Sequence, residues 1–184
     1  MSKIKPSERA ADFVARLRRI QNNRGKMAAL RRGLSRSTVV NAWPVVVGLG
    51  GSIGQPGESV HVDIAALFAT HPEGSNVRNF GDTCRAIAIA HSPDNALPES
   101  YERRFRRLIV SGEPSDLVEQ LRSWIRLASG KGIGVNYESL FADLWNWRWY
   151  ADDIRVQWAR SFWRSGIDTA DAATPENPIQ LANI

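Results

Sequence analysis

Apolar side chains recur every three or four residues along most of this chain, and glycine, proline, serine and asparagine separate one such segment from the next. Residues 99–110 show the pattern clearly, because a helical wheel of about 100° per residue places Tyr101, Phe105 and Leu108 in one narrow arc. No segment shows the alternation of a half-buried strand, and the apolar run at residues 45–47 is too short to form a sheet. The sequence therefore predicts an all-α fold, a compact bundle of about eight or nine helices with basic faces.

The helix boundaries follow from capping residues and from the breaks between apolar segments. The first helix opens near Pro6 and ends before Asn22, and a second covers residues 26–32 and stops at Gly33. A serine at position 35 or 37 would cap a third helix, which Pro44 bends or interrupts. The other predicted helices span residues 60–70, 77–90, 99–110, 114–129, 137–147 and 152–165.

The length of 184 residues is enough to bury one sizeable core. We predict an all-helical domain over residues 1–165, with two helical subdomains joined near 48–59 as a variant of that arrangement. Residues 166–184 hold two prolines, three acids and no basic residue, which predicts a flexible C-terminal tail. No apolar run approaches the roughly 18 residues that span a bilayer, and the basic N-terminus lacks an apolar signal region, so the expected location is the cytoplasm.

Positive charge is concentrated at the N-terminus. Residues 1–36 carry eleven Lys or Arg and two Asp or Glu, whereas residues 37–100 carry two and six. Arginine outnumbers lysine twenty to four, and although a GC-rich genome would raise the arginine content, it would not sort charges along the chain. Because the planar guanidinium binds phosphate through two hydrogen bonds and also stacks on rings, this distribution favours a polyanionic partner.

The sequence shows no set of residues typical of an enzyme or a metal site. Cys84 is the single cysteine, which excludes an internal disulfide and a cysteine-based zinc site. The histidines His61, His71 and His91 lie too far apart for a local metal motif. The stretch VVVGLGGSIGQPGES has Ile53 where the dinucleotide fingerprint requires glycine, so we interpret it as a flexible connector. We therefore predict no catalytic residue, no cofactor and no metal.

Five of the seven tryptophans lie in residues 145–164. On a helix over the last part of this segment, Arg160 and Arg164 share one face, opposite an apolar stripe. A base-stacking platform needs exposed rings among basic residues, and here the periodicity points most rings inward. We therefore expect the two arginines to face outward and interpret these rings as core: Trp158, Phe162 and either Trp145 or Trp149.

Six segments, in this order along the chain, resemble one known family. They are ALRRGLS (29–35), LFATHP (67–72), NFGDTCRAIA (79–88), YERRFRRLI (101–109), GKGIGVNYESLFADLWNW (130–147) and VQWARSFW (156–163). The ordered set is similar to the CasB family, the small subunit of the type I-E CRISPR surveillance complex Cascade. The resemblance covers roughly residues 10–164 in blocks, and it includes neither the connector near 48–59 nor the tail.

One departure from the family pattern precedes the last predicted helix. Asp152 and Asp153 stand where basic residues are expected, and Arg148 or Arg155 is the expected substitute.

The resemblance implies a non-catalytic, all-helical subunit of an RNA-guided complex. Its expected partners are the guide RNA, the target and displaced DNA strands, the backbone and large subunits of Cascade, and a second copy of itself, with no membrane. Because R-loop formation is nearly balanced in free energy, a few backbone contacts of on the order of 1 kcal/mol each would tip it. The residues expected to contact nucleic acid are Lys26, Arg31, Arg32, Arg103, Arg104, Arg107, Arg122, Arg126, Lys131, Arg160 and Arg164.

Two other functions stay open on the sequence alone. A stand-alone helix-turn-helix regulator would use residues 26–47, but Pro44 and the apolar run beside it make a poor recognition helix. Palindromic footprints from a dimer would favour that regulator. A small enzyme would depend on Cys84 or on a histidine, and loss of activity in the variant Cys84→Ala would be its signature.

Overall fold

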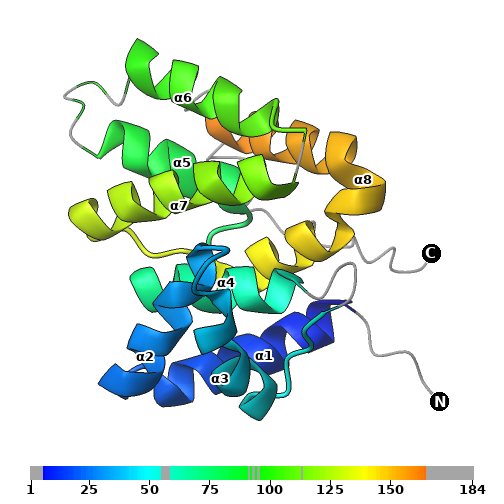
Figure 1. The fold of residues 1–184 in the computed structure, drawn as a ribbon. Coiled ribbons are helices and arrows are strands. Elements are labelled where there is room, and N and C mark those ends of the chain that lie inside the picture. The colour runs from blue at the N-terminus through cyan, green and yellow to red at the C-terminus, as the bar shows by residue number, and fades with distance from the viewer. Residues whose placement is uncertain are drawn as a thin grey trace, which may run out of the picture.

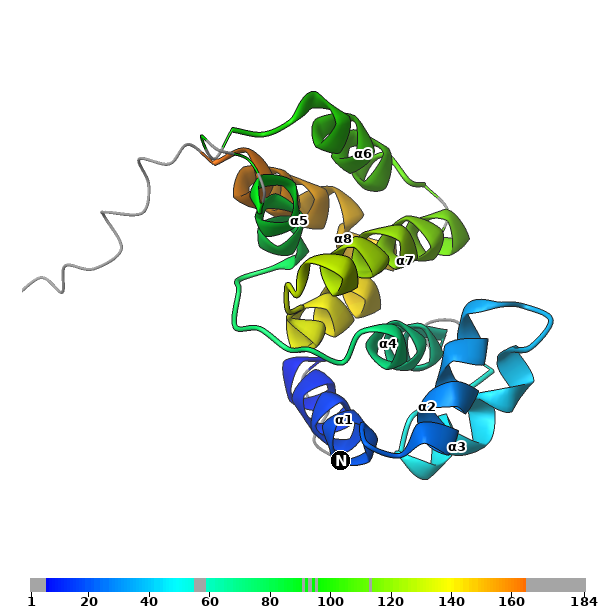
Figure 2. The same cartoon turned by 90° about the vertical axis from the view of Figure 1, so that its left-hand side faces the viewer.

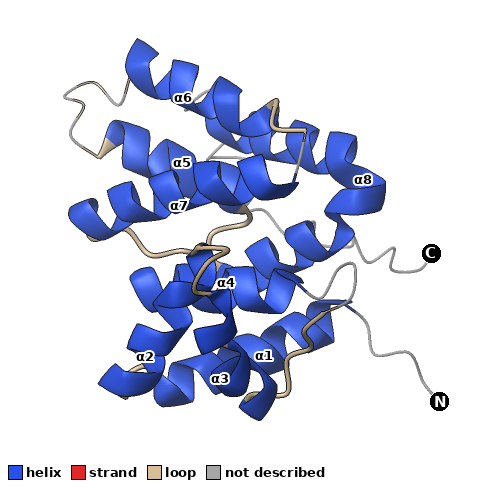
Figure 3. Cartoon of the chain, in the orientation of Figure 1, coloured by secondary structure: helices blue, strands red, loops and turns tan. Residues whose placement is uncertain are grey.

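The structure of the chain, a computed structural model, describes residues 6–54, 59–90, 92, 94, 96–112 and 114–164. Every regular element in these ranges is a helix (Figure 3), and a single bridge between Gly74 and Val135 is the one strand-like pairing among them. The predicted all-α fold is confirmed. The elements are α1 (Pro6–Ile20), α2 (Arg24–Arg31), η1 (Arg32–Leu34), η2 (Val39–Asn41), α3 (Trp43–Gly48), α4 (Ser59–Thr70), α5 (Phe80–Ile89), α6 (Glu99–Ile109), α7 (Pro114–Lys131) and α8 (Tyr137–Trp163), where η marks a 3-10 helix.

Two predicted segments lie wholly or partly beyond this description. The tail 166–184 is outside the described residues, and so are positions 55–58 of the predicted connector, so the predicted domain limits stay predictions. In the part of the chain that is described, no helix is both long enough and apolar enough to cross a membrane.

Capping side chains account for several helix starts. The Asn23 side-chain oxygen accepts the backbone N–H of Lys26 at 3.0 Å, and Asn136 caps α8 through the backbone N–H of Ser139 at the same distance. Pro44 does not interrupt a longer helix as predicted. It lies in the first turn of α3, where a backbone N–H has no helical partner, so the proline starts a helix there.

The two last predicted helices form one element. α8 runs from Tyr137 to Trp163 and bends at Tyr150, whose φ of −132° and ψ of 27° are not helical. The predicted break near residues 148–151 is therefore a kink, and α8 has a first segment before it and a second segment after it.

The two segments of α8 belong to two different packing groups (Figures 1 and 2). In the N-terminal region, α1 to α4, helices α1 and α4 pack on the first segment, where the rings of Phe13 and Phe141 lie 5.9 Å apart, and α2 and α3 pack on α4. In the C-terminal region, α5 to α7, helices α5 and α6 pack on the second segment, where the Phe80 ring lies 5.5 Å from that of Trp158, and α7 packs on α5 and α6. Figure 1 shows α5 to α7 above α1 to α3, with α4 between the two groups.

The packing of α5 against α8 depends on Gly81. A Cβ at this position would overlap the backbone carbonyl of Trp158, so α5 and α8 pack at their observed separation because residue 81 has no side chain. The Trp158 indole is fully buried, and its Nε1–H donates to Asp143 Oδ2 at 2.8 Å. Burial raises the pKa of Asp143 to about 6, although this hydrogen bond acts in the opposite direction.

Candidate nucleic-acid interface

The first group of predicted site residues lies at the end of α2 and the start of η1. Lys26, Arg31 and Arg32 are all exposed. The Nε–H of Arg31 donates to the backbone carbonyl of Ala69 in α4 at 2.7 Å, which fixes the guanidinium plane and leaves its two terminal nitrogens without a partner among the described residues. Among the described residues, the side chains of Lys26 and Arg32 have no partner. We call these three residues the α2–η1 cations.

The second group begins on α6, whose apolar residues Phe105 and Leu108 are fully buried and so turn the arginines outward. Arg103 is exposed and pairs with Glu99 one turn earlier, with Nη1 and Oε1 2.9 Å apart. Arg107 is also exposed, and it has no side-chain partner in the described ranges.

Helix α7 continues this group. Arg104 Nη1 donates to Ser123 Oγ at 2.6 Å, which ties α6 to α7. Arg122 pairs with Glu119 at 3.6 Å along the helix, whereas Arg126 is exposed with no partner among the described side chains. The α6–α7 cations, as we use the term, are Arg103, Arg104, Arg107, Arg122, Arg126 and Lys131.

The remaining predicted residues differ in the interactions that their side chains make within the protein. Lys131 Nζ lies 5.3 Å from the centroid of the Tyr101 ring. Arg160 is exposed, as predicted. Arg164 does not simply face outward as expected, because its Nη1 lies 3.0 Å from Oδ1 of Asp82, a carboxylate that is 5 % exposed and needs a cation beside it.

Other cations were not among the predicted contacts. Arg36, in the loop after η1, and Arg106, on α6, are exposed. The signal for both was present in the sequence, since one closes the N-terminal basic run and the other lies inside ERRFRR. Arg155 and Arg148 were the expected substitutes for the basic residues missing at positions 152 and 153. Arg155 forms an ion pair with Asp152 at 2.7 Å, whereas Arg148 is exposed.

The rings of the last helix are mostly interior. Trp158 and Phe162 are fully buried, which confirms their assignment to the core. Trp145 is partly buried against the core, so the expectation of one further packed tryptophan holds for Trp145. Trp149 is 64 % exposed and Tyr150 is 57 % exposed, because the kink of α8 turns both side chains toward solvent.

The residues considered for catalysis that the structure describes are buried and packed against other parts of the fold. Cys84 is fully buried, and burial raises the pKa of its thiol well above the usual value, so the reactive thiolate is disfavoured. His61 lies among aromatic rings, and His71 Nε2 lies 2.8 Å from the carbonyl oxygen of Ile133. His91 lies outside the described residues. The described residues contain no group of three or more His, Cys, Asp or Glu side chains arranged to hold a metal ion.

The region considered for a helix-turn-helix contains α2, two 3-10 helices and the short α3. α3 has six residues, and its exposed large side chains are Trp43 and Val47 rather than groups that read bases. This geometry gives the regulator alternative no support.

Residues 26–163 match the sequence model of a family described as CRISPR-associated protein Cse2. The matched range includes all eleven predicted contact residues except Arg164. A comparison with curated proteins found no match.

Several solved structures share the fold. A Cse2-family protein from Thermus thermophilus is 24 % identical with a TM-score of 0.69, over 88 % of this chain and 100 % of that chain. CasB from Thermobifida fusca is 18 % identical with a TM-score of 0.68, over 87 % and 99 % of the two chains. A chain of a structure described as a CRISPR RNA-guided surveillance complex is 18 % identical with a TM-score of 0.68, over 86 % and 92 %.

Proposed function

The chain belongs to the CRISPR-associated Cse2 family, and we propose that it is the small subunit of a CRISPR RNA-guided surveillance complex of the Cascade type, where it holds nucleic-acid backbones and stabilises the R-loop without catalysing a reaction. The family match supports the CRISPR context, and the likeness to a chain of a surveillance complex supports a place beside guide RNA and other protein subunits.

The exposure of the α2–η1 cations is the observation that carries this proposal. Lys26 and Arg32 have no internal partner among the described residues, and Arg31 uses one N–H inside the protein. Cations without internal partners bind phosphate without first breaking an ion pair, and each contact releases counterions from the nucleic acid. Base pairing with the guide selects the sequence in such complexes, so contacts to the backbone are sufficient for the role.

The proposal is tested in a complex reconstituted from its protein subunits and a guide RNA. The lifetime of the R-loop on a matched DNA duplex is compared for wild type, for the double variant Arg31→Ala/Arg32→Ala and for a complex that lacks this chain. Two phosphate contacts of about 1 kcal/mol each predict a lifetime at least tenfold shorter for the double variant.

The control removes the same charge elsewhere. Arg19 and Arg78 are exposed and are not among the predicted contacts, and Asp82, which lies 3.9 Å from Arg78, keeps Arg164 as its nearer cation at 3.0 Å. The variant Arg19→Ala/Arg78→Ala is therefore expected to keep the wild-type lifetime within about twofold. If the Arg31→Ala/Arg32→Ala complex assembles and its R-loops last as long as those of wild type, the proposed role of the α2–η1 cations is wrong.

A further inference from the structure

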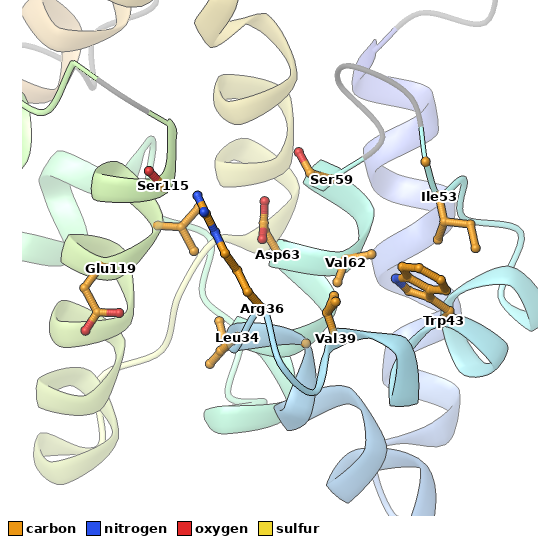
Figure 4. Close-up of a pocket in the computed structure, with 13 residues that line it drawn as sticks. Leu34, Arg36, Val39, Trp43, Ile53, Ser59, Val62, Asp63, Ser115 and Glu119 are labelled. Atoms are coloured by element: carbon orange, nitrogen blue, oxygen red, sulfur yellow. The ribbon is translucent and has the colours of Figure 1, made fainter.

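A cavity of about 500 Å³ lies between α4, α7 and the segment from η1 to α3 (Figure 4). Apolar side chains form much of its wall, among them Val39 and Val62, and the Trp43 indole closes one end. The residues that line it include none of the eleven predicted nucleic-acid contacts. The cavity therefore adjoins the α2–η1 cations through η1 and Arg36 without including any of the predicted contacts.

Asp63 is the feature of this cavity that requires an explanation. It is the one acid in the helix SVHVDIAALFAT, where nine of the twelve residues are buried. Its carboxylate points into the cavity (Figure 4) and has no hydrogen bond or ion pair with any described residue. Burial raises the pKa of Asp63 to about 7, because desolvation disfavours the ionised carboxylate.

The charges around Asp63 are those of an acceptor for a cation. Among the described residues that line this cavity, Arg36 is the single cation and Glu119 of α7 lies on the opposite wall, so with Asp63 ionised these three groups sum to −1. Figure 4 shows the Arg36 side chain extending toward Ser115, and it forms no ion pair with Asp63.

A second cavity of about 610 Å³ adjoins the first on the other side of Asp63. The two share Ser59, Asp63 and Val118, so together they form one groove with the carboxylate near its middle. The second cavity is lined by aromatic side chains near the kink of α8, including Trp145 and the exposed Trp149. It is also lined by the exposed Arg148 and by Arg155, which pairs with Asp152, so the site that accepts a cation is confined to the first cavity. Exposed tryptophans and an apolar floor are typical of a surface that binds another protein.

We propose that this groove docks a segment of a neighbouring protein subunit, and that Asp63 receives the guanidinium of an arginine in that segment. An arginine fits because its apolar stem suits the walls and its N–H groups match a carboxylate. A nucleic-acid strand does not suit the first cavity, because it would bring phosphate beside the carboxylates of Asp63 and Glu119. That the partner is a subunit of the surveillance complex rests on the proposed function.

The test uses the reconstituted complex and three variants of this chain. Asp63→Asn removes the charge at nearly constant shape, Asp63→Lys reverses it, and Glu73→Lys makes the same reversal at an exposed acid outside the groove. The fraction of complexes that contain this chain is measured by native mass spectrometry. We expect about a fivefold loss for Asp63→Asn, a larger loss for Asp63→Lys and a change below twofold for Glu73→Lys.

Folding and alternative occupants are measured on the same samples. Thermal unfolding must show that both Asp63 variants remain folded, and an arginine-to-aspartate change in the neighbouring subunit that restores binding of Asp63→Lys identifies the partner. Wild-type incorporation of both Asp63 variants overturns the proposal. So does a loss confined to self-association of the free chain, which would make the occupant a second copy, or a loss confined to guide-RNA affinity.

A separate readout covers the case in which the wild-type chain does not join the complex at all. That result contradicts the proposed function but not the chemistry of the groove. The probe is then N-acetyl-argininamide added to the isolated chain, with the neutral N-acetyl-citrullinamide as its matched control, and NMR shifts are followed at Asp63 and Trp43. Saturable shifts with the arginine probe alone, absent in Asp63→Asn, support the acceptor role, and equal responses to the two probes overturn it.

Discussion

The α2–η1 cations and the α6–α7 cations are both rich in arginine, but they differ in how many of their side chains form ion pairs or hydrogen bonds within the protein. In the first set, Lys26 and Arg32 have no internal partner among the described residues. In the second set, Arg103 and Arg122 are paired with acids on their own helices and Arg104 is bound to the neighbouring helix, so only part of the set, Arg107 and Arg126, has no partner among the described side chains. The comparison shows that the number of basic residues on a helix does not measure the positive charge that is available to a partner.

The difference has a simple origin in the sequence. No Asp or Glu occurs between Asp12 and Glu58, so the cations of α2 and η1 have no acid within one helical turn. In contrast, Glu99 stands four residues before Arg103, and Glu119 stands three residues before Arg122. These spacings place opposite charges side by side on a helix, and each such pair contributes only about 0.3–0.5 kcal/mol.

The largest predicted effect is that of Gly81→Ala, which disturbs the packing of α5 against α8, the helices against which α6 and α7 lie. In Gly81→Ala the added methyl group overlaps the Trp158 carbonyl, so α5 and α8 must separate, and we expect the free energy of unfolding to fall by about 2–4 kcal/mol. Chemical denaturation measures it. Gly130→Ala is the control, because its Cβ meets no atom within 4 Å in helix α7, and it is expected to stabilise the chain slightly. Equal effects of the two variants would contradict the close approach at residue 81.

A smaller effect is predicted where the N-terminal and C-terminal regions meet, at Asp63. Its folded-state pKa of about 7 lies above the ordinary value of 3.8, so the folded state binds the proton more tightly and wild-type stability declines as the pH rises from about 4 to 7. Asp63→Asn removes this dependence and should raise the free energy of unfolding at pH 8 by roughly 1–2 kcal/mol, a value reduced for solvent that reaches the cavity.

Denaturation at pH 4, 6 and 8 checks this expectation. The advantage of the variant should be small at pH 4, grow up to about pH 7 and level off above it. A difference that is constant with pH would mean that Asp63 is not the titrating group.

The sequence predicts the fold better than it predicts the availability of charge. Periodicity places Trp158 and Phe162 in the core, because local spacing is sufficient to define the buried stripe of a helix. It does not show that Arg164 pairs with Asp82, which lies 82 residues earlier, nor that Arg31 bonds to the carbonyl of Ala69. These bonds depend on how helices pack against one another, which no local pattern contains.

The kink of α8 and the groove illustrate the same limit. The sequence predicts a break near residues 148–151, but it does not predict that the break turns Trp149 and Tyr150 toward solvent. Asp63 was detectable as a lone acid in an apolar helix, yet its cavity is formed by α7 and by the segment from η1 to α3, which are distant in sequence.

The smallest predicted effect comes from removing the acids that pair with two of the α6–α7 cations. The double variant Glu99→Gln/Glu119→Gln frees Arg103 and Arg122 from exposed ion pairs, so stability should change by less than about 0.5 kcal/mol. Affinity of the reconstituted complex for a matched duplex should rise about twofold, as measured by electrophoretic mobility shift. An unchanged affinity would mean that these two side chains do not face the nucleic acid.

The most direct test of this difference in available charge compares two variants that remove equal charge. Lys26→Ala/Arg32→Ala removes two cations without internal partners among the described residues, and Arg103→Ala/Arg122→Ala removes two that are paired. The dissociation constant of the reconstituted complex for a matched duplex is measured over a range of salt concentrations. Each lost phosphate contact lowers the slope of log affinity against log salt by about 0.9, so we predict a decrease of nearly 2 for the first variant and less than 1 for the second. Equal decreases, or a larger decrease for the second variant, would contradict the claim that available charge, rather than total charge, defines the nucleic-acid surface.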